Sequence, residues 1–246
     1  MSDSRDYDEF FEVFENKSWH MAQQKIYNAS DDSLYGCELL IRLFQGERFI
    51  SNGRFFPEIC RDTRFPGVTA TIIELVEQHF LRSPDIFPPV TFFNITPVDV
   101  EDTTTINVLK RVAQLFAAHE RVLALELSEI FEPDELHSCE IASLALKESG
   151  AWVGLDDFGV LELTLEDVRR FPFDFVKSDR SLCLDEAALA NPLHQQLRAL
   201  ADEKDMLLIA EGVETRALVE GLTKLGYDLI QGYVFHKPEK FLEQIA

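Results

Sequence analysis

The sequence has little basic charge. It contains 23 Lys and Arg residues against 44 Asp and Glu residues, which gives a formal net charge of −21 at pH 7. Nucleic acids and anionic membranes are both bound mainly through clusters of basic side chains. The balance of charge therefore argues against a protein that binds DNA or RNA duplexes or a membrane surface. Most of the acidic excess is interpreted as a solvated surface.

Cysteines are few, and no segment reads as a targeting or membrane-spanning sequence. The four cysteines form no CxxC pair and no zinc-like cluster, so they are interpreted as reduced, structural thiols. No apolar run approaches the roughly 18 residues of a membrane span. The N-terminus is acidic and lacks the basic and then apolar pattern of a signal peptide. The cytoplasm follows as the default location.

Several common catalytic motifs are also missing. Neither the GxGxxG nor the GxxxxGK[ST] phosphate-binding loop occurs, which weakens the dehydrogenase and nucleotide-kinase interpretations. The six histidines are scattered along the chain, so a histidine-based catalytic triad has no support.

What the sequence does contain is a regular alternation of strand-like and helix-like segments. Six of the strand-like segments hold nearly continuous apolar runs, which is typical of strands buried on both faces of a parallel sheet. Eight such segments in one domain of 246 residues favour an α/β fold of the TIM-like (β/α)8 barrel type, with an open sheet as the alternative. The predicted strands are 21–29, 34–43, 90–96, 122–129, 151–157, 173–179, 207–214 and 228–235.

The first two strands are predicted to be antiparallel. The link between them, from Asn28 to Ser33, is too short for a parallel crossover, which needs about a dozen residues or more. The preceding residues, 1–19, form an acidic amphipathic segment whose aromatic side chains are expected to cover one end of the barrel, with a partner surface as the alternative. These side chains are Tyr7, Phe10, Phe11 and Phe14.

Polar side chains recur at the carboxyl ends of the predicted strands. In a parallel barrel these ends meet at one mouth, where active sites are built. Taken singly, each residue could cap a helix or form a turn. Taken together, their carboxylate and amide oxygens suit a hard divalent cation such as Mg²⁺ or Mn²⁺. The residues are Glu38, Asn94, Glu126, Asp156, Asp157, Lys177, Asp179, Glu211, Glu214 and Gln231.

The stretch AWVGLDDFG, residues 151–159, raises the choice between a turn and a metal site most clearly. An apolar strand ends in two adjacent aspartates, although neighbouring carboxylates repel each other and each is costly to bury unpaired. Asp156 and Asp157 either form an ordinary turn or bind a metal.

Seven ordered motifs together resemble the EAL-domain family of cyclic di-GMP phosphodiesterases, from about Gln23 to Pro238. The resemblance implies a single EAL domain over 1–246, with residues 20–246 forming a TIM-like barrel whose first strand is antiparallel. The motifs are Glu38-Leu39-Leu40, Asn94-Ile95-Thr96, Glu126-Leu127-Ser128-Glu129, Asp156-Asp157-Phe158-Gly159, Lys177-Ser178-Asp179-Arg180, AEGVET at 210–215 and QGY at 231–233.

The resemblance also implies an activity, the hydrolysis of cyclic di-GMP to linear pGpG with two Mg²⁺ or Mn²⁺ ions. Two such ions about 3.5–4 Å apart lower the pKa of a bridging water and stabilise an in-line displacement. By resemblance, the first metal is bound by Glu38, Asn94, Glu126 and Asp156, and the second by Asp156, Asp157 and Glu211. Lys177 orients the attacking water, and Glu211 could also act as a base.

The remaining matches lie on the substrate side or in the supporting loops. Arg42 matches a contact to the substrate phosphate, and Glu129 matches the residue that anchors the loop after Asp156-Asp157. The other substrate-side positions are Gln24, Asp179, Glu214 and Gln231.

The sequence departs from the family after Gly159. Active members continue Thr-Gly-Tyr-Ser-Ser, whereas this chain reads Val160-Leu161-Glu162-Leu163-Thr164. The departure motivates an alternative function, a catalytically inactive EAL module that acts as a cyclic di-GMP receptor or a protein-interaction domain. Leu161 and Leu163 are interpreted either as buried residues or as a contact for a partner, which includes a homodimer.

Overall fold

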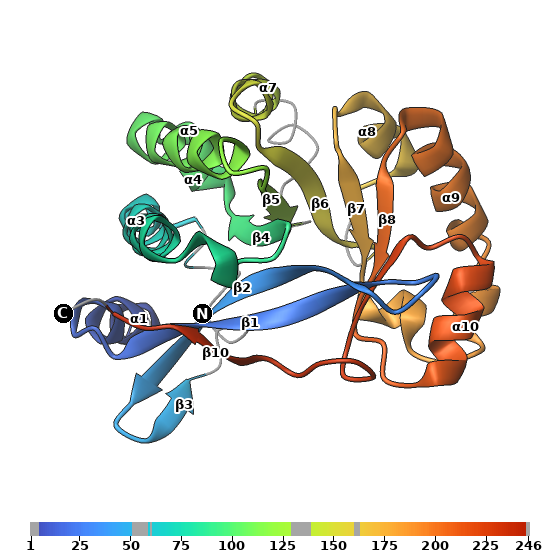
Figure 1. The fold of residues 1–246 in the computed structure, drawn as a ribbon, viewed down its shortest axis with the longest axis horizontal. Coiled ribbons are helices and arrows are strands. Elements are labelled where there is room, and N and C mark those ends of the chain that lie inside the picture. Colours follow the sequence, from blue (N-terminus) through green and yellow to red (C-terminus); the bar gives the residue numbers. More distant parts are fainter. Residues whose placement is uncertain (1–4, 51–58, 60, 129–138, 160–162, 245–246) are drawn as a thin grey trace.

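In the part of the chain that this computed structural model describes (residues 5–50, 59, 61–128, 139–159 and 163–244), eight strands close into a barrel (Figure 1). β2 and β4 to β9 follow one another as parallel neighbours, and β1 pairs antiparallel with both β2 and β9 to close the ring. The predicted TIM-like fold with an antiparallel first strand is confirmed. The strands are β1 (Trp19–Asn28), β2 (Leu34–Gln45), β4 (Val90–Ile95), β5 (Val122–Ser128), β6 (Trp152–Phe158), β7 (Phe175–Ser178), β8 (Leu207–Ala210) and β9 (Leu229–Gln231).

Two predicted strands end earlier than expected. β8 was predicted to run to 214 and β9 to 235, but they stop at Ala210 and Gln231. Gly212 has φ +64°, a conformation that ends an extended strand. A Cβ on Gly232 would come within 2.0 Å of the Val213 carbonyl oxygen, so the two turns that follow β8 and β9 approach each other closely.

Two strands that the sequence did not predict extend the β1–β2 hairpin beyond the barrel. β3 (Arg48–Ile50) pairs with the end of β2, and β10 (Glu239–Leu242) pairs with the start of β1. Helix α1 (Arg5–Glu15) lies beside this extension (Figure 1). The ring of Phe14 stacks on Trp19 at 4.8 Å, and Phe10 stacks on Phe65 at 6.1 Å. Phe10, Phe11 and Phe14 of α1 are buried, as expected for a cover, and the side chain of Tyr7 lies outside those described.

The longer helices form the outer layer around the barrel (Figure 1). Each turns its apolar side inward: on α3, the residues Ile72, Leu75, Val76 and Phe80 are all buried. The helices are α3 (Phe65–Arg82), α4 (Pro97–Glu101), α5 (Thr103–Ala117), α7 (Glu140–Glu148), α8 (Leu165–Arg170), α9 (Leu193–Lys204) and α10 (Arg216–Lys224), with short 3₁₀ turns η2 (Pro84–Ile86), η3 (Arg180–Cys183) and η4 (Ala188–Ala190). No described helix combines the length and apolar character needed to cross a membrane.

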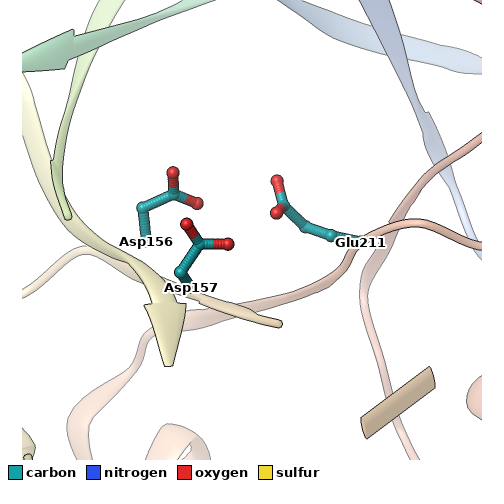
Figure 2. A group of neighbouring side chains, drawn as sticks. All are labelled: Asp156, Asp157 and Glu211. Atoms are coloured by element: carbon teal, nitrogen blue, oxygen red, sulfur yellow. The ribbon is translucent and has the colours of Figure 1, made fainter. Parts of the chain in front are cut away.

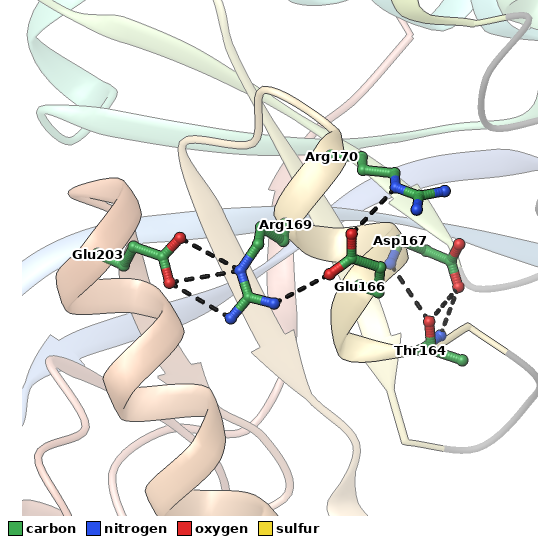
Figure 3. Close-up of polar contacts among 6 residues, drawn as sticks. All are labelled: Thr164, Glu166, Asp167, Arg169, Arg170 and Glu203. Carbon is green, nitrogen blue, oxygen red and sulfur yellow. Dashed lines mark hydrogen bonds and ion pairs between the residues drawn. The ribbon is translucent and has the colours of Figure 1, made fainter.

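Helix α8 follows the segment where the sequence departs from the family, and its position is fixed by polar contacts (Figure 3). Thr164 and Asp167 form a reciprocal capping box at its N-terminus. Arg169 bonds Glu203 on α9 with N–O distances of 3.2–3.3 Å. Leu163 is only 6% exposed. The interpretation of Leu163 as a contact for a partner is therefore wrong, and Leu161 lies outside the described residues.

The interior of the barrel has an apolar floor. The ring of Phe92 packs edge-on against that of Phe175, with the two centroids 5.2 Å apart. Gly154 makes room for this pair, because a Cβ there would come within 2.3 Å of the Phe175 ring. We call this set the barrel floor, and its members are Ile26, Val90, Phe92, Ala124, Phe175, Ile209 and Leu229.

Candidate active site at the barrel mouth

Directly above the barrel floor lies a layer of polar side chains. Alternate residues of a strand face the same side, so a residue two positions after a floor residue also points into the barrel. Phe92 is thus followed by Asn94, and Phe175 by Lys177. Gly36 and Gly154 stand in the same relation to Glu38 and Asp156. We call this set the polar layer, and its members are Glu38, Asn94, Glu126, Asp156, Lys177, Glu211 and Gln231.

Asp156 and Asp157 face the same space although they are adjacent in a strand. Strict alternation would send their side chains to opposite faces. Here the β6–β7 register shifts between Leu155 and Phe158, and Asp157 takes a φ of +56°, which Asp tolerates better than most residues. Both carboxylates consequently turn toward Glu211 (Figure 2). The three residues can place carboxylate oxygens within 4.8 Å of one another, so this group could hold a metal ion.

Lys177 is the cation at the centre of the polar layer, and its side chain is fully buried. Its Nζ lies 2.9 Å from Glu126 Oε1 and 3.0 Å from Asp156 Oδ1. It also forms ion pairs with Glu211 and, at 3.5 Å, with Glu38. The four carboxylates come from four different strands or strand ends, so one ammonium group holds the whole layer together.

Glu38 is held in place by the two amide side chains of the layer. Asn94 Nδ2 donates to Glu38 Oε1 at 2.8 Å, and Gln231 Nε2 donates to Oε2 at 2.7 Å. These bonds orient the carboxylate and leave the amide oxygens free to face elsewhere. Gln231 Oε1 is buried and has no hydrogen-bond partner among the described residues.

The carboxylates of this site do not share one electrostatic environment. Burial raises the pKa values of Glu126, Asp156 and Glu211 despite the nearby ammonium of Lys177. Burial and the charge of Asp156 raise the pKa of Asp157 to about 7.

Glu38 is the exception. Burial opposes its ionisation, but Lys177 and the two amide donors outweigh burial, so its pKa is lowered. The surrounding carboxylates also raise the pKa of Lys177 well above its usual value, although burial opposes this. Lys177 therefore stays charged, and the layer holds more negative charge than it can neutralise.

The donor set fits divalent cations. If all are ionised, five carboxylates and one ammonium sum to −4. Glu126 Oε2 is buried without any hydrogen-bond partner among the described residues, which is a costly arrangement unless a cation faces it. Hard oxygen donors of this kind suit Mg²⁺ or Mn²⁺ rather than zinc bound by thiolates.

Two clefts open on the site from different sides. The acidic cleft has a volume of about 340 Å³ and is lined by Glu38, Asp179, Glu211, Glu214 and others. The apolar cleft, of about 250 Å³, is lined mainly by apolar side chains together with Arg42 and Asn94. Both clefts share Leu40, Asp156 and Asp157 in their walls. The two aspartates thus stand where the clefts meet.

The structure places the predicted substrate-side residues on these two walls. Gln24, Asp179, Glu214 and Gln231 line the acidic cleft, whereas Arg42 lines the apolar one. Glu129 lies outside the described residues. The roles assigned to all these residues stay predictions.

Among the wall residues of the acidic cleft that were not predicted from the sequence, Arg180 and Tyr233 are the two with a charged or aromatic side chain. Both belong to motifs already recognised, Lys177-Ser178-Asp179-Arg180 and Gln231-Gly232-Tyr233. Their position directly after a strand end was the available signal, because side chains there face the mouth.

The fold and the site define a TIM-like barrel with an acidic centre, able to hold metal, at the carboxyl ends of its strands. The chain belongs to the EAL domain family, whose sequence model matches residues 7–238. The resemblance to this family is thereby confirmed.

Curated relatives include proteins named cyclic di-GMP phosphodiesterases. PdeR of Escherichia coli is 34% identical over 149 residues, which is 59% of this chain and 22% of PdeR. The probable cyclic di-GMP phosphodiesterase PdeN of the same organism is 24% identical over 239 residues, 94% of this chain and 45% of PdeN. The chain thus spans less than half the length of either relative.

Solved structures show the same fold. The PaMucR phosphodiesterase in complex with c-di-GMP superposes with a TM-score of 0.75 at 22% identity, covering 91% of this chain and 97% of that one. The FimX EAL domain gives a TM-score of 0.73 at 18% identity, covering 98% of each chain.

Proposed function

We propose that this chain is a metal-dependent phosphodiesterase that hydrolyses cyclic di-GMP to linear pGpG. The meeting of the two clefts at Asp156 and Asp157 carries this proposal. A cyclic dinucleotide has two nucleoside arms joined through phosphodiesters. Two clefts that share the aspartates accommodate one arm each and leave a phosphodiester over the carboxylates. Relatives named cyclic di-GMP phosphodiesterases support the choice of substrate.

The charge of the site supports two divalent cations, since the sum of −4 equals the charge that two such ions neutralise. Glu38, Asn94, Glu126 and Asp156 would hold one cation, and Asp156, Asp157 and Glu211 the other. When bound, the cations would lower the pKa of a water and stabilise the charge that develops on the phosphoryl oxygens.

The residues of the chain supply the remaining steps. The raised pKa of Lys177 keeps it protonated and it pairs with four carboxylates, so its Nζ could orient an attacking water by hydrogen bonding. Glu211 contacts Lys177, and its raised pKa suits it to accept the proton of that water. The water oxygen bonds to phosphorus while the bond to the 3′ oxygen breaks, and the leaving oxygen takes a proton from solvent. Arg42 would bind a phosphate oxygen from the apolar cleft.

A turnover assay tests the proposal. The protein is incubated with cyclic di-GMP in Mg²⁺ or Mn²⁺, with and without chelator, and the products are separated by chromatography. We expect pGpG to form only with metal, and Glu38→Gln to abolish it. Glu77→Gln, at an ion pair with Arg111 on the outer helices, is the matched control and should leave turnover unchanged.

Two other results would change the conclusion. Cyclic di-GMP that binds without turnover would favour the receptor function raised by the altered segment 160–164. Neither binding nor turnover by a folded protein would contradict both functions.

A further inference from the structure

The acidic cleft has an unbalanced wall. Six carboxylates line it, and among the described residues Arg180 is the one cationic side chain that does. Lys177 lies beneath the wall, within the polar layer. The carboxylates are Glu38, Asp156, Asp157, Asp179, Glu211 and Glu214.

Arg180 is held in this wall both by its guanidinium group and by its aliphatic stem. Its Nη2 donates to Glu214 Oε1 at 2.9 Å. Its stem lies on the turn after β8, where a Cβ on Gly212 would come within 2.5 Å of Arg180 Cγ. Gly212 also has φ +64°, so the turn needs glycine for its backbone as well as for this contact. Arg180 thus covers the turn that carries both Glu211 and Glu214.

The charges on the wall of the acidic cleft suggest why Arg180 pairs with Glu214. In the proposed function, two divalent cations and Lys177 balance the five carboxylates of the centre. Asp179 and Glu214 then remain against Arg180, which leaves a net charge of −1. Without Arg180 the wall would present −2 to a substrate that carries two negative phosphodiester groups. Because the pair is about half exposed, screening keeps the effect moderate.

We propose that Arg180 is a positioning residue of the acidic cleft, which neutralises Glu214 and fixes the turn at 211–214 so that a dianionic dinucleotide can enter. The inference rests on the proposed function and adds a residue that acts on substrate binding rather than on the chemical step. It requires that the guanidinium charge, and not only the packing of the stem, matters.

The test compares Arg180→Met, which keeps the stem, with Arg180→Lys, which keeps stem and charge. With cyclic di-GMP in Mg²⁺ at low salt, we expect Arg180→Met to raise KM roughly 5-fold with kcat within about 2-fold of wild type. Arg180→Lys should recover most of this loss. At about 0.5 M KCl the difference in KM should shrink to less than about 2-fold, because the Debye length falls below roughly 5 Å.

Guanosine, which has no phosphate, serves as a neutral probe. As a competitive inhibitor it should bind wild type and Arg180→Met equally. Arg169→Met is the matched control, because Arg169 forms an Arg–Glu pair of similar exposure with Glu203 on the outer helices (Figure 3). It should leave KM unchanged.

The proposal fails if Met and Lys variants lose affinity equally, if the change in KM is independent of salt, or if guanosine binding weakens as much as that of cyclic di-GMP. These results require an active wild type, so they are distinct from a failure of the proposed function. If wild type binds cyclic di-GMP without turnover, the same comparison of Kd values applies. A wild type that neither binds nor hydrolyses it overturns both proposals.

Discussion

The barrel floor and the polar layer are built by the same strands, two residues apart, yet they have opposite energetics. In the floor, Phe92 and Phe175 are fully buried within an apolar cluster, which stabilises the fold by about 1.5–3 kcal/mol for each such side chain. In the polar layer, Glu126 and Asp156 are almost as deeply buried but share one ammonium with two other carboxylates. Burial of charges with incomplete pairing costs several kcal/mol.

The difference shows which part of the barrel makes the fold and which part makes the site. Strand alternation places both sets, so the barrel cannot build its mouth without its floor. The floor is an apolar cluster, whereas the polar layer has buried oxygen atoms that lack hydrogen-bond partners in the part of the chain that the structure describes. The layer is therefore the part of the interior expected to respond to cations, and the floor is not.

Of the substitutions considered, replacing Lys177 should cause the largest loss of activity and of stability. If the proposed function holds, we expect Lys177→Met to reduce kcat by roughly 10²–10⁴-fold, because the variant loses the group proposed to orient the attacking water. Without metal it should also be destabilised, by about 3–5 kcal/mol, because four buried carboxylates lose the ammonium group that pairs with them. Single-turnover kinetics with cyclic di-GMP and urea unfolding in chelator measure the two effects.

Lys147→Met is the control for this variant. Lys147 is partly buried, whereas Lys177 is fully buried; Lys147 bonds Asp174 at 2.8 Å and lies on α7, away from the barrel mouth. It should lose some stability and keep its kcat. Equal losses of kcat in both variants would show that Lys177 acts through the fold alone.

Asp99 sharpens the comparison, because it is a buried carboxylate outside the polar layer. It is fully buried at the start of α4, where it accepts hydrogen bonds from Thr96 N and Oγ1 at 2.8 and 2.7 Å. Burial nevertheless raises its pKa from 3.8 to about 6. Its protonated form stabilises the fold below pH 3.8, and this contribution is lost as the pH rises through 6.

Asp99→Asn should therefore gain stability relative to wild type as the pH rises. The amide oxygen can still accept both bonds from Thr96, so the helix cap is kept. Between pH 4 and pH 7.5 the difference in free energy of unfolding should change by up to about 3 kcal/mol in favour of the variant. Urea titrations at several pH values measure it. A difference that does not vary with pH would contradict the raised pKa.

Divalent cations should stabilise the protein through the polar layer. At a free Mg²⁺ concentration about 100 times Kd, wild type should gain about 2.7 kcal/mol in free energy of unfolding, relative to chelator, for each cation that it binds. Asp157→Asn keeps a residue that tolerates the φ of +56° but removes a candidate ligand, so its gain should be smaller. Asp99→Asn should gain as much as wild type. Equal gains for wild type and Asp157→Asn would exclude Asp157 as a ligand.

Much of the fold and of the site's location follows from the sequence. Apolar runs with polar ends predicted the eight strands of the barrel. The short link at Asn28–Ser33 predicted the antiparallel pair of first strands. A backbone hydrogen bond from Asn28 N to Ser33 O closes this link at 2.9 Å. The polar residues expected within the strands lie at the mouth because strand alternation and strand direction place them there, whereas Asp157 reaches it only through a register shift and a positive φ.

The remaining features depend on long-range contacts that no local pattern shows. β3 and β10 are only three and four residues long and exist because they pair with the β1–β2 hairpin. The shared direction of Asp156 and Asp157 depends on a register shift against β7. Arg180 gains its place from Gly212, more than 30 residues along the chain. In each case the deciding partner is distant in sequence.

The smallest expected effect tests whether the floor supports the layer above it. Gly154→Ala places a Cβ within 2.3 Å of the Phe175 ring and should cost about 1–3 kcal/mol of stability, measured by urea unfolding. Phe175→Leu in the same chain should restore part of this loss by making room. Gly67→Ala is the control, because apart from its own helix no described atom lies within 4 Å of a Cβ at that position in α3, and it should be neutral or slightly stabilising.

Turnover by the double variant, Gly154→Ala with Phe175→Leu, then shows whether the floor affects catalysis in the polar layer as well as stability. Gly154 lies two residues before Asp156, so a ring displaced by the new Cβ would press on the strand that carries the aspartates. If the floor only supplies stability, Gly154→Ala with Phe175→Leu should regain kcat together with its free energy of unfolding. If stability returns and kcat does not, the packing of the floor also sets the position of Asp156. The two layers would then not be separable parts of the barrel.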